Sequence, residues 1–511
     1  MGSVVNCYSA RCVGGASVPH ADKAMKKATL LASAQRAQSN GALAGGGSPG
    51  PAQWAQEEFA HAQLPDQRLV ARLITMATDF AQQPTATLPQ ACGSWAKTKA
   101  AYRFFDHDGL TPEALLASHV QATVQRAAAH RLVLCVQDTS TLNYSTHPQT
   151  QGLGPISNNR DKTIGLLLHS TLAVTPSGQP LGLLHAQSWT RSTATFGRSS
   201  HARNRTPQAD KESQKWRRSL AACQALAAQC PDTTLVSVGD REGDLYELFA
   251  DAQTPREGPR VELLVRAQHD RQVVHPQKTL WACLAAQRVS GRLDLQVPRK
   301  AGQPARLATL AIRYTRVTLC PPCLKADQPS LTLWAVEARE TRPPKGVQPV
   351  CWRLLTTRPV ASFATAVELV GWYAQRWQIE VLHKVLKSGC QVEQRQLETA
   401  ARLKRVVAVD LIVGWRVLAL CQAGRETPEG LASDWLSGAE WRALSCYMEE
   451  RTTPPRRPPT VRQAVRWIAQ LGGFLGRRRD GEPGPIVIWR GLQQLRAITA
   501  AWKKFGHEKC G

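Results

Sequence analysis

Hydrophobic positions recur with the period of an α-helix from about residue 51 to residue 130. Leu69, Leu73 and Met76, for example, fall on one helical face, which would turn towards a core. The pattern predicts a small helical domain over residues 51–125.

Basic residues occupy the other faces of these predicted helices. Arg68 and Arg72 lie four residues apart on one helix, and Lys97, Lys99 and Arg103 lie on a second. Such a surface is typical of contact with DNA, and equally of a helical face that is simply solvated. The pattern alone leaves both interpretations open.

The spacing changes beyond residue 126. Short apolar runs at 132–136, 166–174, 181–184 and 235–238 have the length and composition of buried strands. A Pro-Ser-Gly turn separates the second run from the third and predicts a hairpin. Helical patterns flank the last run. The order strand, hairpin, helix, strand, helix predicts a mixed α/β core.

More strands follow between about 258 and 360, and we interpret this stretch as an all-β insertion into the core. Its predicted strands are 261–266, 293–297, 307–319, 331–338 and 352–356. Helical periodicity then returns and continues through most of the C-terminal part.

The chain as a whole divides into four predicted parts. The first 50 residues are rich in Ala, Gly and Ser, a composition typical of a linker or disordered extension. The predicted parts are the extension 1–50, the helical domain 51–125, the α/β domain 126–425 with its insertion, and a helical region 426–511.

Charge is the feature of the composition that changes this picture. Lys and Arg number 64 against 39 Asp and Glu, so the formal net charge is +25. This excess favours a polyanionic partner, above all nucleic acid. A membrane surface is the competing partner, but the most apolar run, 406–421, contains Asp410 and Arg416 and is too short to span a bilayer. We expect a buried helix there and no membrane partner.

The 14 cysteines show no paired spacing, so we expect reduced thiols and a cytoplasmic protein. Cys320 and Cys323 form a CxxC pair, but a structural zinc site needs a second pair of ligands. We interpret the pair as part of a Pro-Pro turn.

Two aspartates stand directly after short apolar runs. Asp138 follows the run 132–136 by two residues, and Asp240 follows the run 235–238 and a glycine. The carboxyl ends of neighbouring strands open into a common cleft, so the two carboxylates would converge if the strands are neighbours. Either residue alone fits a turn or a helix cap as well.

A third carboxylate lies on a helical segment between residues 373 and 387. At ~100° per residue, its polar side chains fit a stripe of ~80°. These polar residues are Tyr373, Arg376, Glu380, Lys384 and Lys387. The opposite face carries the apolar residues Ile379, Leu382, Val385 and Leu386. An exposed helix with Glu380 in ion pairs is the alternative, but it does not explain the tyrosine or the excess of cations.

Phosphodiester chemistry gives three carboxylates a purpose. It requires an activated water or hydroxyl and stabilisation of the attacking and leaving oxygens, which two Mg²⁺ ions roughly 4 Å apart provide. About three carboxylates hold such a pair of ions, with water and phosphate as the remaining ligands. Neighbouring Arg, Lys and Tyr side chains would keep the DNA backbone in register.

The spacing Tyr373-(2)-Arg376-(3)-Glu380-(6)-Lys387 resembles the Y-R-E-K signature of the insertion-sequence-four family of DDE transposases, and within it the transposon-five type. Asp138-Thr-Ser and Asp240-Arg-Glu-Gly-Asp extend the resemblance, as do Ala-Tyr-Arg-Phe at 101–104 and Leu-Gly-Gly-Phe at 471–474. It covers about residue 53 to the C-terminus.

The resemblance implies a ribonuclease-H-like core, a helical N-terminal DNA-binding domain and a C-terminal dimerisation region. It implies cut-and-paste transposition through a DNA hairpin, by a homodimer that synapses two transposon ends and joins them to target DNA. Asp138, Asp240 and Glu380 would hold two Mg²⁺ ions, for which Mn²⁺ would substitute. The implied DNA contacts are Tyr373, Arg376, Lys384, Lys387, Arg266 and Trp352, to which we add Arg68, Arg72, Lys97 and Arg103.

Trp352, 21 residues before Tyr373, matches the family's base-stacking aromatic. A core tryptophan is the alternative, since the chain contains 15 of them. Gln268 departs from the family, which carries a lysine there, and puts the local contact near Arg266 in doubt.

Two other functions compete with an active transposase that works in the bacterial cytoplasm at the nucleoid. One is a non-catalytic relative that only occupies transposon ends, against which the intact set of carboxylates argues. The other is a host nuclease with the same fold, against which the residues around Glu380 argue.

Overall fold

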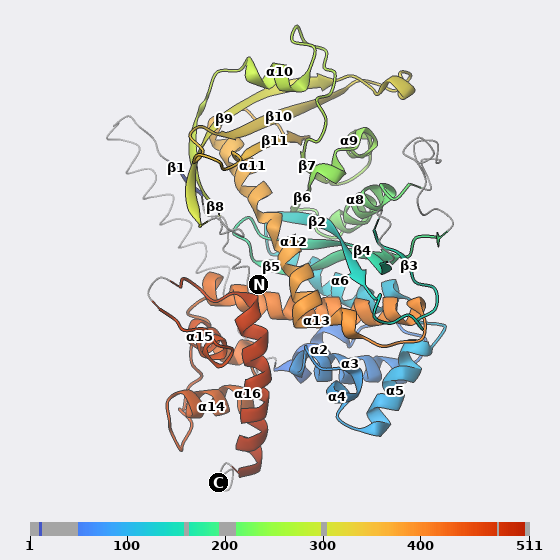
Figure 1. Cartoon of the computed structure of the whole chain (residues 1–511), viewed down its shortest axis with the longest axis vertical. Coiled ribbons are helices and arrows are strands. Elements are labelled where there is room, and N and C mark those ends of the chain that lie inside the picture. Colours follow the sequence, from blue (N-terminus) through green and yellow to red (C-terminus); the bar gives the residue numbers. More distant parts are fainter. Residues whose placement is uncertain are drawn as a thin grey trace.

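Eleven strands form one mixed sheet in the part of the chain that the computed structural model describes, which is residues 10–12, 50–157, 163–193, 211–297, 304–477 and 480–505. The strand order is β1-β8-β9-β10-β11-β7-β6-β2-β4-β3, and β5 pairs with β4. Apolar clusters lie on both faces, so helices cover the sheet on each side (Figure 1).

The centre of the sheet confirms the strands expected from the apolar runs. β2 (Leu132–Asn143) pairs in parallel with β6 (Thr234–Gly239), which pairs in parallel with β7 (Glu262–Arg266). On its other side β2 is antiparallel to β4 (Ile164–Val174), and β4 forms the predicted hairpin with β5 (Pro180–Trp189). Short β3 (Gly154–Pro155) pairs with β4 as well.

The predicted insertion continues this sheet instead of forming a separate module. Its strands are β8 (Gly291–Val297), β9 (Arg306–Leu319), β10 (Leu331–Glu340) and β11 (Cys351–Thr356), joined antiparallel, with β11 on β7. The stretch also contains a helix, α10 (Leu280–Ala285), which corrects the expectation of strands alone. Its Leu280, Cys283 and Leu284 are buried against the sheet, so a single turn of helix covers apolar surface there.

Of the first 50 residues, the structure describes only Gly50 and the strand β1 (Ala10–Cys12), which pairs with β8. The helical N-terminal part follows. Its helices are α2 (Pro51–Phe59), α3 (Gln67–Gln82), α4 (Leu88–Cys92), α5 (Trp95–Asp106) and α6 (Pro112–Ala128). Leu73 and Met76 are buried in α3 as predicted, and Leu69 only partly.

The remaining helices divide between the two faces of the sheet. The helices α8 (Gln214–Ala227) and α9 (Tyr246–Gln253) share an apolar cluster with α10 on one face. The helices α11 (Phe363–Gln375), α12 (Trp377–Lys384) and α13 (Ala400–Glu426) share the cluster on the other face with the N-terminal helices.

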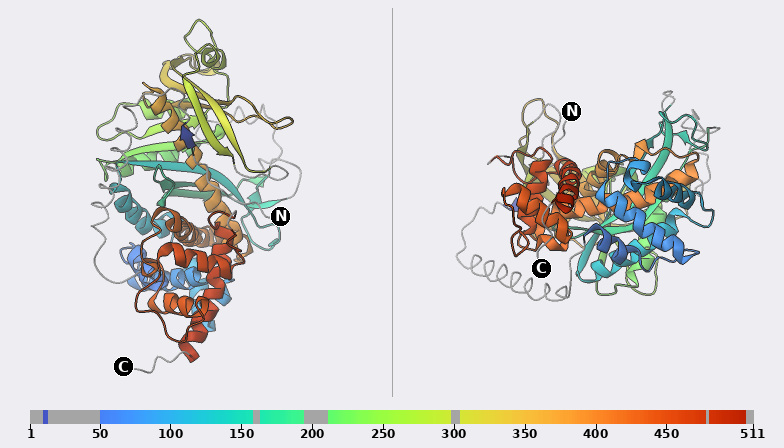
Figure 2. Two further views of the ribbon diagram at one scale, coloured as in Figure 1. Left: turned by 90° about the vertical axis from the view of Figure 1, so that its left-hand side faces the viewer. Right: turned by 90° about the horizontal axis from the view of Figure 1, so that it is seen from below.

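The C-terminal helices are α14 (Gly438–Met448), α15 (Val461–Leu471) and α16 (Pro485–Phe505). They lie beside the N-terminal helices, at the end of the molecule opposite the insertion (Figures 1 and 2). Helix α13 contacts both the C-terminal helices α15 and α16 and the strand β5 of the sheet. It is long and apolar enough to cross a membrane, but 94% of its most apolar window is buried inside the protein. The structure thus agrees with the buried helix expected from residues 406–421.

Candidate active site

The pairing of β2 with β6 brings two of the three carboxylates together. The parallel register ends with Val136 paired to Val238, and Asp138 and Asp240 each follow two residues later. The charge of Asp240 acts on the carboxyl group of Asp138, so the two side chains lie near each other. Side chains two residues apart on a strand point to the same face of the sheet. Val136 and Val238, two residues before the aspartates, pack in the apolar cluster shared with α11–α13, so both aspartates belong to that face. The convergence expected from the sequence is therefore present.

Asp138 corrects one detail of that expectation, because it lies inside a strand and not after its end. β2 continues to Asn143 and pairs with β4 from Leu134 to Asn143, whereas β6 stops at Gly239. Among the described strands, the polar half of β2 pairs with β4 alone. Asp138 thus stands just beyond the point where the parallel pairing with β6 ends.

Asp240 is the residue that caps a short 3-10 helix, Arg241–Gly243. One of its carboxylate oxygens accepts a hydrogen bond from the backbone N–H of Glu242 at 2.8 Å, which orients the side chain. Asp244, at the end of the same motif, is buried. It accepts hydrogen bonds from the backbone N–H of Gln268 at 2.7 Å and pairs with Arg271. The motif therefore fixes the turn after β6 and with it the position of Asp240.

Glu380 comes from α12, which packs over the same face of the sheet. The prediction of one continuous helix across 373–387 was wrong at two places. The helix breaks at Arg376, between α11 and α12, and continues after Lys384 as a π-helix, Val385–Gly389. The polar stripe predicted for a uniform helix is therefore not a single exposed face. Tyr373 is buried, while Arg376 and Glu380 are half-buried.

Arg376 joins two of the carboxylates. Its guanidinium donates to Asp138 at 3.3 Å and also to Glu380, four residues further along. Only 14% of the Arg376 side chain is exposed, against 20% for Asp138 and 29% for Glu380. Arg376 thus ties α12 to β2 at the point where the third carboxylate approaches the other two.

Asp138 is the carboxyl group whose acidity the site changes most clearly. Its pKa is raised to about 6, first of all by burial, while the nearby charge of Arg376 opposes the rise. The charges of Asp240 and Glu380 contribute to the same rise, so the three carboxylates repel one another. A concentration of negative charge of this kind is what a bound cation would relieve.

The chemistry of the donors fits Mg²⁺ or Mn²⁺, since carboxylate oxygens are the ligands that these hard cations prefer. Among the residues that the structure describes, no three Asp, Glu, His or Cys side chains are gathered tightly enough to hold an ion. Arg376 accounts for this in part, because its guanidinium lies between Asp138 and Glu380.

A buried hydrogen bond holds α12 on the sheet, and the sequence did not predict it. His383, one turn after Glu380, shares a hydrogen bond of 2.8 Å with the hydroxyl of Ser170 on β4. Burial and the nearby Lys387 lower the pKa of His383 to about 3, so its ring is neutral. The signal that was available is Ser170 itself, a polar residue inside the apolar run of β4 that pairs with Asp138.

Two further predicted DNA contacts, Arg266 and Trp352, lie on the neighbouring strands β7 and β11. Arg266 ends β7, where the register with β6 places it beside Asp240, and it donates to the carbonyl oxygen of Cys351 at 3.0 Å. Trp352 on β11 is 8% exposed, and its ring packs edge-on against Tyr373 with centroids 5.0 Å apart.

The two predicted lysines lie beyond Glu380. Lys384 ends α12, and Lys387 belongs to the π-helix; both are half-buried. Burial lowers the pKa of both amines. The residues of the Y-R-E-K region thus follow one another along α11, α12 and the π-helix and not along one continuous helix.

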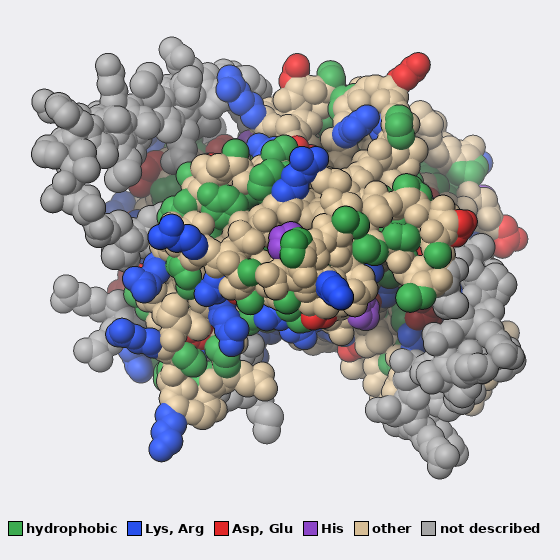
Figure 3. All heavy atoms as spheres, turned by 90° about the horizontal axis from the view of Figure 1, so that it is seen from above, with side chains coloured by type: hydrophobic (Ala, Val, Ile, Leu, Met, Phe, Trp, Pro, Cys, Tyr) green, Lys and Arg blue, Asp and Glu red, His purple; other side chains and the backbone are tan. Residues whose placement is uncertain are grey.

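The basic residues of the N-terminal helices lie away from the carboxylates. Arg68, 92% exposed, pairs with Asp66 at 2.6 Å, and Lys97 pairs with Asp79 at 3.1 Å. Arg103 on α5 is exposed and Arg72 on α3 is half-buried. Lys and Arg side chains also lie scattered over the end that carries the insertion, where few Asp or Glu are seen (Figure 3).

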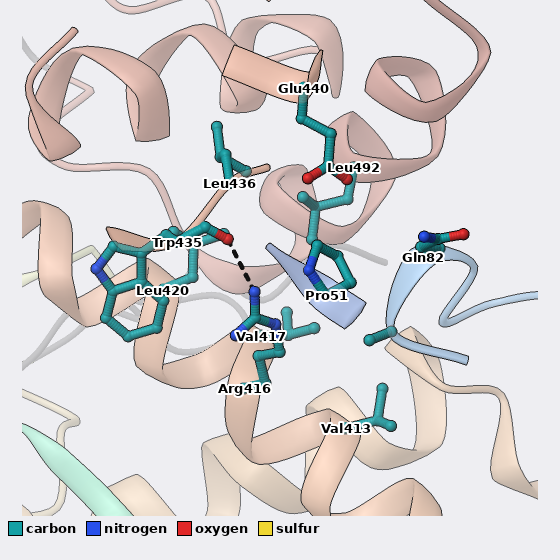
Figure 4. A pocket seen from close by; sticks show the side chains of 11 residues that line it. Pro51, Gln82, Val413, Arg416, Val417, Leu420, Trp435, Leu436, Glu440 and Leu492 are labelled. Carbon is teal, nitrogen blue, oxygen red and sulfur yellow. Dashed lines mark hydrogen bonds between the residues drawn. The ribbon is translucent and has the colours of Figure 1, made fainter. Parts of the chain in front are cut away.

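A separate cavity of about 30 Å³ lies where the N-terminal helices, α13 and the C-terminal helices meet. Pro51, Gln82 and Glu440 line it, and Arg416 donates to the carbonyl oxygen of Trp435 at 2.8 Å (Figure 4). The cavity has room for water and not for a nucleotide. The cavity is a packing gap between the N-terminal helices, α13 and the C-terminal helices, and not a competing active site.

Comparison with known proteins identifies the two helical ends of the chain. Residues 51–110, which comprise α2–α5, match the family described as Transposase DNA-binding. Residues 412–505 match the Transposase Tn5 dimerisation domain, which begins inside α13, earlier than the predicted boundary at 426.

Among solved structures, a cryo-EM structure of a piggyBac transposase synaptic complex with hairpin DNA is similar at 8% identity and a TM-score of 0.30. The match covers 73% of this chain and only 57% of that chain. A likeness of this size supports no argument about function.

Proposed function

We propose that this chain, which belongs to the Tn5-type transposases, cuts DNA at transposon ends and joins those ends to target DNA by cut-and-paste transposition. One observation carries the proposal. The pairing of β2 with β6 brings Asp138 near Asp240, and Arg376 links Asp138 to Glu380. Three carboxylates so placed in a chain with DNA-binding and dimerisation domains suit phosphodiester chemistry.

Asp138, Asp240 and Glu380 would hold two Mg²⁺ ions, with Mn²⁺ as a substitute. Bound there, the ions supply an activated water or hydroxyl and stabilise charge on the attacked phosphate. The protein's part is to hold the carboxylates on rigid elements, Asp138 on β2 and Glu380 on α12. Arg376, Lys384 and Lys387 would hold the phosphates of the DNA strand in line with the carboxylates.

The strand arrangement supports a ribonuclease-H-like core. β5, β4 and β2 are successively antiparallel, and β6 and β7 then follow in parallel with β2. Asp138 lies on the central strand β2, Asp240 directly follows the neighbouring strand β6, and the glutamate comes from a helix that covers this unit. The ribbon β8–β11 would extend the surface that meets DNA.

We further propose that a homodimer synapses two transposon ends, nicks each end and forms a hairpin intermediate before joining. Trp352 would receive a base extruded near the hairpin, which requires its ring to leave the contact with Tyr373. Such an enzyme would act on chromosomal DNA in the cytoplasm at the nucleoid.

Single substitutions of Asp138, Asp240 and Glu380 by Ala test the proposal. With a duplex that carries the DNA flanking the coding region, and with Mg²⁺, we expect nicking to be lost and gel-shift binding to be retained, because metal ligands serve the chemical step. Glu368→Ala, an exposed carboxylate of α11, is the matched control and should nick normally. A triad variant that nicks at the wild-type rate would be removed from the proposed set.

A further inference from the structure

The guanidinium of Arg376 binds the same carboxylates that the proposed metal site would use. It contacts both Asp138 and Glu380, and the central carbon of the guanidinium lies 5.9 Å from the centroid of the Tyr373 ring. The residue forms the break between α11 and α12: its N–H bonds the carbonyl oxygen of Tyr373 at 3.1 Å, and its own carbonyl accepts from Ile379 at 3.2 Å. These short turns aim the guanidinium at the carboxylates.

The same oxygens cannot serve a guanidinium and a metal at once. A guanidinium neutralises carboxylates through directed N–H donors, whereas Mg²⁺ or Mn²⁺ takes their lone pairs directly. The guanidinium has an alternative partner, because it binds a phosphate through two parallel hydrogen bonds. The backbone of DNA carries such phosphates at regular intervals.

We propose that Arg376 is an internal substitute for the metal. Its guanidinium binds Asp138 and Glu380 until a DNA phosphate binds the guanidinium instead and frees the two carboxylates. This inference rests on the proposed function, and it adds an order of events: DNA binds first, and tight metal binding follows. A transposase regulated in this way would carry a complete metal site only when DNA is in place.

The surroundings of Arg376 allow its side chain to move while the carboxylates stay in position. Asp138 lies on a strand paired with β4 through Asn143, and α12 is anchored by the bond between His383 and Ser170. The exchange therefore needs rotation of one long side chain and not movement of an element. Coupling between two ligands at this scale changes affinity by about 5- to 150-fold.

Binding of Mn²⁺ to the full chain, measured by the electron paramagnetic resonance of free Mn²⁺, tests the inference without any cleavage. We expect weak binding to DNA-free wild type and stronger binding once flanking duplex is added, by about 5- to 150-fold. DNA-free Arg376→Ala and Arg376→Gln should bind Mn²⁺ about as strongly as the wild-type complex with DNA. Two variants guard against a fold defect in one.

Two controls locate the effect. Arg358→Ala removes an arginine that is also paired, with Glu262 at 2.9 Å and 31% of its side chain exposed, and it should leave Mn²⁺ binding unchanged. Mn²⁺ that binds to DNA alone is measured separately and subtracted. Asp240→Asn should then abolish the Mn²⁺ sites that DNA creates in the wild-type protein, and Asp240→Asn combined with Arg376→Ala should abolish the sites that Arg376→Ala creates without DNA.

The failures of the two proposals are distinguishable. If DNA-free Arg376→Ala and Arg376→Gln bind Mn²⁺ no more strongly than DNA-free wild type, while DNA still creates Asp240-dependent sites in wild type, the substitution by Arg376 is wrong and the metal site stands. If Asp240→Asn changes Mn²⁺ binding in no state, the metal site itself is wrong.

Discussion

Glu58 offers the sharpest test of how the N-terminal helices are fixed to the catalytic sheet. It lies on α2, is 3% exposed, and accepts from His119 at 2.5 Å and from Arg126 at 3.1 Å. Those partners in turn bind the sheet, since the backbone N–H of Leu183 donates to His119 and Arg126 donates to the carbonyl oxygen of Leu181. Replacing Glu58 by Ala would leave both partners without their anion.

Two arguments give the size of the loss. Burial alone would raise the pKa of Glu58, but His119 and Arg126 outweigh it and lower the pKa from 4.5 to about 2. At ~1.4 kcal/mol per pKa unit this shift corresponds to about 3 kcal/mol. Removal of one partner of a buried ion pair costs about 3–5 kcal/mol in other proteins. We therefore expect Glu58→Ala to weaken the junction by about 3–5 kcal/mol.

Hydrogen exchange measured by mass spectrometry reports this junction locally, which matters because a multidomain chain need not unfold in one step. Amides of α2 and of β5 should exchange faster in Glu58→Ala than in the wild-type protein. The ratio of the two exchange rates should correspond to the expected loss of about 3–5 kcal/mol. Glu57→Ala, an exposed neighbour on the same helix, should change exchange by less than about 0.5 kcal/mol. Equal exchange in the two variants would refute the account of the junction.

The pH dependence of the same junction has a definite sign. The folded-state pKa of Glu58 lies below its ordinary value, so the ionised form stabilises the fold above about pH 4.5, and this contribution is lost as the pH falls towards 2. Glu58→Gln keeps an acceptor but lacks the charge. The difference in local stability between wild type and Glu58→Gln should stay constant from pH 7 to about 5 and narrow below about 4.5; a difference that widens in acid would contradict the assignment.

Three further predictions concern the site and its partner. Ser170→Ala leaves buried His383 without its hydrogen bond, at a cost of about 1–3 kcal/mol, and should reduce cleavage more than DNA binding, whereas Thr171→Val is the matched control because the Thr171 hydroxyl makes no hydrogen bond within the described residues. Trp352→Ala should cost about 3–5 kcal/mol because its ring is buried; at a temperature where the variant is folded, nicked ends should accumulate without hairpins, and a normal hairpin yield would exclude the proposed role. Binding to flanking duplex should weaken with a log–log salt slope of about −5 or steeper if six or more phosphates are neutralised, and a flat slope would oppose nucleic acid as the partner of the +25 charge.

The sequence predicted those parts of the fold that depend on burial. The apolar runs became β4, β5, β6 and β7, and the apolar residues between 379 and 386 became the buried faces of α12 and of the π-helix that follows it, since an apolar pattern records which side chains leave water. The same logic placed Asp240 directly after β6, whereas it missed that β2 continues beyond Asp138 to Asn143.

The sequence did not predict features that depend on pairing between distant segments. The polar half of β2, from Asp138 to Asn143, resembles a loop by composition, and pairing with β4 makes it a strand. The break at Arg376 and the π-helix after Lys384 violate the uniform period on which the helical stripe relied. The bond between Ser170 and His383 joins residues 213 positions apart, which no local pattern records.

The central claim is that Asp138, Asp240 and Glu380 together hold the divalent metal ions that cut DNA. A structure of the full chain with flanking duplex and Mn²⁺, with manganese located by anomalous scattering, tests it most directly. We expect manganese in contact with all three carboxylates and the Arg376 guanidinium on a DNA phosphate. Manganese bound elsewhere, with Arg376 still between Asp138 and Glu380 in the DNA complex, would contradict the account.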